Sequence, residues 1–194
     1  MKIELINEEV AFDEFFKVYK ADLRFEKFDG KMSDKVTRYS FEKSDAVAVL
    51  IYHTSKDAYI LVRQFRYPPV HHETDPWLVE IVAGGKEDNE HDNDAAMREV
   101  EEETGYSPLK LQRICTCYVS PGLMNERVTI FVADIDDTSR RNDGGGASGE
   151  DEDIELVWIP RKKANQWMES QQVGDAKTII ALQWHQTNFS PKEY

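Results

Sequence analysis

Residues 84–106 hold the densest group of side chains in the sequence that could do chemistry. Glu99, Glu102 and Glu103 fall within a strongly helical stretch, residues 93–104. On a helix, Glu99 and Glu103 lie about 40° apart around the axis, and Glu102 lies about 60° to the other side of Glu99. The three carboxylates therefore share one face, where their repulsion favours solvent or a bound hard cation such as Mg²⁺. The alternative is an ordinary solvated acidic face, because charge runs are usually surface.

The spacing of the fixed residues is more specific than the acidic run. The pattern is Gly-x5-Glu-x7-Arg-Glu-U-x-Glu-Glu-x-Gly-U, where U is apolar, and this is the Nudix box. The matching residues are Gly84, Glu90, Arg98, Glu99, Val100, Glu102, Glu103, Gly105 and Tyr106. A pattern with this many fixed positions is a strong motif. It favours a metal site over a solvated helix face.

The segments around the box resemble those of bacterial ADP-ribose pyrophosphatases of the Nudix superfamily. The resembling segments are residues 28–33, 63–66, 76–84, 120–127, 150–154 and 181–184. The resemblance covers about residues 25–187, and hydrolases of GDP-mannose and other nucleoside-diphosphate sugars share much of it. It implies hydrolysis of ADP-ribose to AMP and ribose 5-phosphate by a homodimer that uses Mg²⁺, with Mn²⁺ as a substitute. A non-catalytic Nudix-like module that senses a nucleotide is a further alternative, although such a sensor would not need the intact glutamates.

The resemblance also implies roles for residues of the box. The implied metal ligands are Glu99, Glu102, Glu103 and the backbone carbonyl of Ala83, with Glu102 counted among the catalytic residues as well. The supporting residues are Gly84, Glu90 and Arg98, which hold the loop and the helix carboxylates in place. Relatives often have an apolar residue and Gly where this box has Lys86 and Asn89. Both departures bear on the shape of the loop.

The remaining site residues lie outside the box. Metal ions would neutralise the pyrophosphate and lower the pKa of the attacking water, and a carboxylate would take its proton. The resemblance places this base on a loop before the last strand, which indicates Glu150 as base and Glu152 as a metal contact, unless the acidic run is only solvated loop. It implies that Arg66 and Glu126 contact the substrate and that Arg38 reaches it from the partner subunit. Either arginine could instead be an ordinary strand-surface residue.

Hydrophobic patterning predicts the elements that must position these residues. Strands are expected at residues 36–41, 45–53, 59–67, 77–82, 109–119, 128–134 and 154–159, and helices at 93–104, 162–169 and 176–187. Residues 12–28 contain at least one extended segment, and residues 136–153 read as a polar loop. Strands and helices mix without regular alternation, which indicates an α+β fold; the resemblance implies an α/β/α sandwich. We expect a small N-terminal sheet over residues 1–42, used in dimerisation, and a Nudix domain over residues 43–194.

Composition and the start of the sequence narrow the class of partner and the cell compartment. The chain has 194 residues, 40% of them hydrophobic, and a net charge of −13, which argues against a nucleic-acid partner. The start lacks a signal-peptide pattern, and the longest apolar stretch, residues 46–52, is too short to span a bilayer. Cys115 and Cys117 share one side of a predicted strand and read as thiols of a reducing compartment. These features predict a cytoplasmic protein without a membrane partner.

Overall fold

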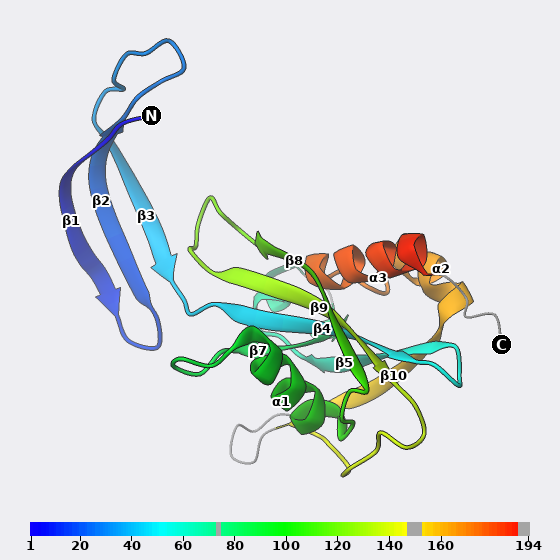
Figure 1. Cartoon of the computed structure of the whole chain (residues 1–194). Coiled ribbons are helices and arrows are strands. Elements are labelled where there is room, and N and C mark those ends of the chain that lie inside the picture. The colour runs from blue at the N-terminus through cyan, green and yellow to red at the C-terminus, as the bar shows by residue number, and fades with distance from the viewer. Residues whose placement is uncertain (73–74, 147–152, 190–194) are drawn as a thin grey trace. The chain divides into compact units, whose positions relative to one another are not determined.

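The computed structural model describes residues 1–72, 75–146 and 153–189. The chain divides into two compact units (Figure 1). The first comprises Met1–Asp45 together with Tyr118–Arg127, and the second comprises the rest. The segment after the second cysteine thus returns to the N-terminal unit, which a simple boundary at residue 42 does not anticipate. Among the described residues, no helix combines the length and apolar character that crossing a bilayer requires.

The N-terminal unit is an antiparallel sheet in the order β1-β2-β3. Its strands are β1 (Ile3–Asp13), β2 (Lys17–Phe25) and β3 (Val36–Glu42). Strands β2 and β3 agree with the extended segments predicted here, and Gly30 adopts φ of 78° in the turn region between them. Strand β1 was not predicted, because all eleven of its residues are exposed and the strand lacks a clean alternation of apolar and polar residues. Two register shifts interrupt its pairing with β2.

The second unit is built on a mixed sheet in the order β10-β5-β4-β9-β8, with β6 beside β5 and β7 beside β4. The strands are β4 (Ala46–His53), β5 (Ala58–Phe65), β6 (Trp77–Glu80), β7 (Val82–Gly85), β8 (Lys110–Tyr118), β9 (Arg127–Ile135) and β10 (Glu155–Pro160). Strand β4 is buried throughout and runs parallel to β9. A strand covered on both faces reads as a continuous apolar run, which is why residues 45–53 were recognised.

Helices cover both faces of this sheet (Figure 1). Helix α1 (Asp92–Thr104) buries Ala96 and Val100 in one core cluster with Val47 and Val49 of β4. Helix α3 (Ala176–Asn188) packs in a second cluster on the other face, together with the short helix α2 (Ala164–Glu169). Each fully buried aliphatic side chain contributes roughly 1.5–3 kcal/mol. The α+β sandwich predicted from the sequence is confirmed.

Three predicted boundaries were wrong. Residues 77–82 form two short strands, β6 and β7, separated at Ile81, whose backbone amide donates to the Thr178 hydroxyl instead of continuing one ladder. Helix α1 begins at Asp92 with His91 as its N-cap residue, and no side chain caps it. The helix expected at residues 162–169 starts as the 3₁₀ turn Arg161–Lys163 before α2, a common transition at helix ends. A second 3₁₀ turn spans Pro68–His72.

Candidate functional site

The box starts where β7 pairs with β4. Gly84 lies opposite Val47 in this ladder. A β-carbon at Gly84 would overlap the carboxylate of Glu99, so the Glu99 side chain lies directly on the β7 backbone. Only glycine permits this approach. The first fixed residue of the box is therefore required by the position of one of its glutamates.

Arg98 joins the carboxylates of the box to one another. Its Nε and Nη2 atoms donate to the two oxygens of Glu90, each at 3.0 Å. Its Nη1 donates to Glu99 Oε1 at 2.7 Å and to Glu102 Oε2 at 3.0 Å, and Nη2 also donates to the carbonyl of Gly85 at 3.1 Å. A planar guanidinium can bridge several acceptors in this way, and a lysine cannot.

Arg98 and the three glutamates that it contacts, Glu90, Glu99 and Glu102, form the Arg98 hub. The opposite charges in this hub attract one another. The hydrogen bonds from Arg98, and then one from the backbone amide of Glu87, hold the pKa of Glu90 below its usual value. Glu90, and then Glu99 and Glu102, raise the pKa of Arg98. Glu90 and Arg98 therefore form a charged pair at neutral pH. The supporting role that the resemblance implies for Glu90 and Arg98 stays a prediction, and these contacts are what it would use.

The loop between β7 and α1 is held by its own hydrogen bonds. The amide of Glu87 donates to Glu90 Oε2 at 3.0 Å, and the amide of Glu90 donates to the carbonyl of Glu87 at 3.1 Å. Asn89 has φ of 64°, in the left-handed region that Asn tolerates better than most residues. Asn89 therefore adopts a conformation that suits the Gly often found there in relatives, and the turn is kept.

The carboxylates on α1 differ in burial. Glu99 is 9% exposed and Glu103 is 4% exposed, whereas Glu102 is only partly buried. Glu102 and Glu103 lie in the last turn of α1, where no basic residue is present and the helix dipole disfavours negative charge. Buried carboxylates at a helix C-terminus are costly without a nearby cation. A bound cation would offset that cost.

The chemistry of this donor set fits a hard divalent cation, which prefers carboxylate and carbonyl oxygens. The positions of these side chains do not yet form a metal site. Within residues 1–72, 75–146 and 153–189, no three His, Cys, Asp or Glu side chains are grouped closely enough to hold an ion. Arg98 supplies the positive charge beside Glu99 and Glu102 in this structure. Ala83, whose carbonyl would be a metal ligand by the family resemblance, lies in β7 opposite Ala48.

A glycine-rich segment caps the C-terminus of α1. The amides of Gly145 and Gly146 donate to the carbonyls of Glu103 and Glu102, at 2.9 and 3.1 Å. Gly105 ends the helix with φ of 74°. All three residues from Gly144 to Gly146 adopt positive φ in making this cap. Glu150 and Glu152 lie outside the described residues, so their roles stay predictions.

The three predicted substrate contacts fall in different places. Arg66 belongs to the same unit as the box, and its Nε and Nη2 donate to the buried carboxylate of Glu80, at 3.2 and 2.8 Å. Arg38 and Glu126 belong to the N-terminal unit. There Arg38 donates to the carbonyl of Thr37, and Glu126 pairs with Lys43 at 3.1 Å. The structure therefore places Arg66 in the same unit as the box and the other two in the N-terminal unit, and all three substrate contacts stay predictions.

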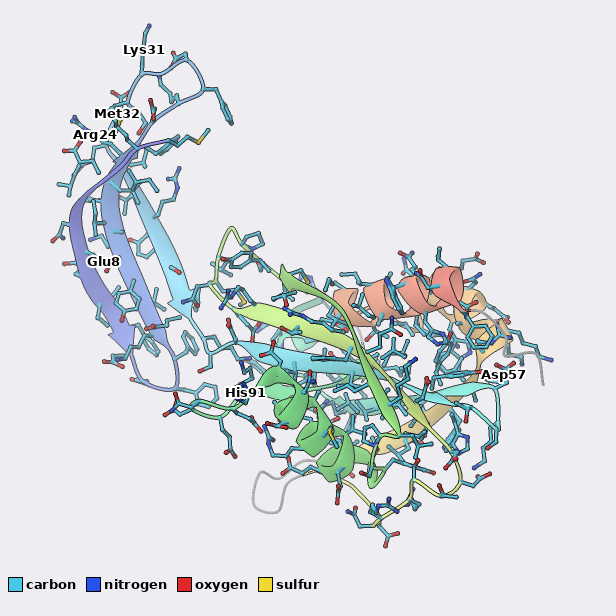
Figure 2. The ribbon with its side chains drawn as sticks, in the orientation of Figure 1. Glu8, Arg24, Lys31, Met32, Asp57 and His91 are labelled. Carbon is cyan, nitrogen blue, oxygen red and sulfur yellow. The ribbon has the colours of Figure 1, made fainter. Side chains whose placement is uncertain are left out.

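A cavity of about 790 Å³ lies on the other face of the sheet, beside α3. No residue of the box lines it. Its wall includes Tyr52 and Asp57, which share a hydrogen bond, and Arg161, which pairs with Asp57. Figure 2 shows Asp57 and His91, the residue before α1, at opposite ends of the unit. The cavity and the box are therefore separate features.

Comparisons with known proteins agree on one family. The family model described as NUDIX domain matches residues 42–182. An ADP-ribose pyrophosphatase of Haemophilus influenzae is 34% identical over 97% of this chain and 88% of its own length. A GDP-mannose pyrophosphatase of Cronobacter sakazakii is 32% identical over 94% of both chains. A solved structure titled "Crystal structure of ADP compounds hydrolase" has a TM-score of 0.74, 23% identity and 96% coverage of both chains, which supports the fold.

Proposed function

Because the chain belongs to the Nudix family of pyrophosphohydrolases, we propose that it hydrolyses the pyrophosphate bond of ADP-ribose to AMP and ribose 5-phosphate. The observation that carries this proposal is the Arg98 hub, which keeps Glu90, Glu99 and Glu102 together. Support for the substrate comes from relatives at 34% identity that are named ADP-ribose pyrophosphatases. Enzymes of this family generally use a divalent metal.

In this proposal the metal is Mg²⁺, or Mn²⁺ in its place. Glu99, Glu102, Glu103 and the carbonyl of Ala83 would hold it. When bound, it would neutralise the pyrophosphate and lower the pKa of the attacking water. Arg98 and Glu90 keep the carboxylates oriented in the absence of substrate. Their role resembles that of outer-shell partners, whose loss typically lowers metal affinity or activity by 10–100-fold.

The other chain groups would bind the substrate and move the proton. Arg66 is fixed by Glu80 in an orientation that is set before the substrate arrives, which lowers the entropic cost of binding a phosphate. Glu150 would take the proton from water and Glu152 would contact the metal. Arg38 of the partner subunit and Glu126 would contact the substrate. The homodimer that this requires is supported by β1, which exposes Ile3, Leu5, Val10 and Phe12.

Hydrolysis of GDP-mannose is the second candidate. The match to a relative with that name covers 94% of this chain and 94% of the relative. The match to the ADP-ribose pyrophosphatase of Haemophilus influenzae covers 97% of this chain but 88% of that relative. Both reactions would use the same carboxylates and would differ only in the groups that contact the base and sugar. The substrates therefore have to be separated by assay.

A hydrolysis panel tests both candidates. Purified protein with Mg²⁺ would receive ADP-ribose, GDP-mannose, UDP-glucose, NADH and diadenosine polyphosphate, with phosphatase-coupled phosphate release as the readout. Glu103→Gln should abolish turnover, and Glu101→Gln, on the same helix but at a variable position of the box, should not. Fastest turnover of ADP-ribose supports the first proposal, and fastest turnover of GDP-mannose supports the second. Nucleotide binding without any turnover would instead indicate a sensor.

A further inference from the structure

A row of polar side chains crosses from the edge of the sheet to the box loop. Arg113 Nη2 donates to Thr116 Oγ1 at 2.5 Å, and Thr116 Oγ1 lies 2.9 Å from Thr129 Oγ1. Thr129 Oγ1 donates to Asp92 Oδ2 at 3.0 Å, and Lys86 Nζ pairs with Asp92 Oδ1 at 2.5 Å. The row therefore joins β8 and β9 to the first residue of α1 and to the loop before it.

The chemistry of the groups sets the direction of these hydrogen bonds. An ionised carboxylate only accepts, so the single hydroxyl proton of Thr129 is used toward Asp92. Thr129 can then only accept from Thr116, which in turn accepts from Arg113. Both ends of the row donate toward the same acceptor, the carboxylate of Asp92. Removing that carboxylate would leave Thr129, which is 5% exposed, without its acceptor.

The pair formed by Lys86 and Asp92 closes the box loop at its base. The two side chains are only 23% and 31% exposed, which strengthens their attraction relative to a surface pair. Lys86 directly follows Gly85, whose carbonyl accepts from Arg98. Asp92 begins the helix that carries Arg98 and Glu99. A shift of Lys86 would therefore move the backbone acceptor of Arg98 relative to the helix.

We propose that Lys86 and Asp92 are positioning residues that hold the box loop against α1, with Thr129, Thr116 and Arg113 fixing the orientation of Asp92. The part of this proposal that concerns metal affinity rests on the proposed function. The carboxylates around Arg98 then keep their places because the loop cannot move away from the helix.

The test uses hydrogen exchange of the loop amides in metal-free protein. Lys86→Met and Asp92→Asn each remove the pair, and exchange at Glu87 and Glu90 should become at least about tenfold faster. Asp94→Asn is the matched control, because Asp94 is an exposed acid in the same first turn of α1. The double variant should exchange no faster than either single variant, since coupled residues are not additive. Lys86→Arg should retain slow exchange.

Mn²⁺ affinity, measured by the electron paramagnetic resonance of free Mn²⁺, provides the second readout. Lys86→Met and Asp92→Asn should weaken binding by about 10–100-fold, and Asp94→Asn should not. Unchanged exchange in both single variants, or additive effects in the double variant, would overturn the proposal that Lys86 and Asp92 hold the loop. Faster exchange with unchanged Mn²⁺ affinity would overturn the link between this pair and the carboxylates around Arg98. If wild-type protein neither binds Mn²⁺ nor hydrolyses any nucleotide, the proposed function fails, while the exchange data still decide whether the pair holds the loop.

Discussion

The carboxylate of Glu99 occupies the space that a β-carbon on residue 84 would need. This contact ties the end of β7 to the second turn of α1, two elements that also pack on each other through the core on that face of the sheet. The position of Glu99 is therefore set from two sides, by the absence of a side chain at Gly84 and by the guanidinium of Arg98. A small change at either position should move the same carboxylate.

Gly84→Ala should remove most of the activity while the fold is kept. The new methyl group would displace Glu99, and a misplacement of about 1 Å can lower a rate by 10²-fold. Gly85→Ala is the control, because a β-carbon there meets nothing within 4 Å and its carbonyl remains. Initial rates on the best substrate, with circular dichroism to verify folding, measure the effect. Equal activity of the two variants would show that the position of Glu99 does not matter.

Arg98→Lys should lower activity by about 10–100-fold, in the range measured for outer-shell residues. A lysine keeps the charge but cannot bridge Glu90, Glu99, Glu102 and the carbonyl of Gly85 with one planar group. The Mg²⁺ concentration that gives half-maximal rate should rise together with the loss of kcat. A kcat and Mg²⁺ dependence like those of wild type would mean that charge alone suffices at this position.

The box helix and the buried strands could be predicted because their signals are local. Helix α1 has a Gly stop at Gly105 and helical periodicity, and β4 is a continuous apolar run. The spacing of Glu99, Glu102 and Glu103 also identified a shared helix face without any tertiary information.

The features that sequence reasoning missed depend on contacts between segments distant in the chain. Strand β1 has no buried residue to create a pattern. Asp92 is an N-cap type of residue directly before the helix predicted at residues 93–104, but its carboxylate bonds to Lys86 and Thr129 instead of capping the helix. The cap formed by Gly145 on the carbonyl of Glu103 joins positions more than forty residues apart. Such contacts leave only a weak signal, a glycine in a polar loop, in the sequence.

Gly144→Ala should destabilise the protein by about 1–3 kcal/mol, the cost of a strained backbone conformation. Gly144 has φ of 67°, and a β-carbon there would meet the backbone of Thr104 and Glu103. Gly145→Ala separates backbone strain from steric overlap. Its φ is also positive, but no atom outside its chain neighbours lies within 4 Å of the added carbon. Urea unfolding of both variants measures the difference. A Gly144→Ala protein as stable as wild type would contradict the close packing of this cap on α1.

His185 should make the protein less stable as the pH falls from about 6.5 to about 4. Burial, and then the positive charge of Arg161, lower the pKa of His185 to about 4, and its Nδ1 shares a 2.8 Å hydrogen bond with the hydroxyl of Tyr59. The unfolded chain binds a proton near pH 6.5, above the pKa of the folded state, so protonation favours unfolding within this window. The full contribution is present above pH 6.5, and the loss should reach up to about 3 kcal/mol near pH 4. Urea unfolding at several pH values measures the slope, with His185→Gln expected to flatten it and the exposed His91→Gln expected to leave it unchanged. An equal slope in wild type and His185→Gln would assign the acid sensitivity to other groups.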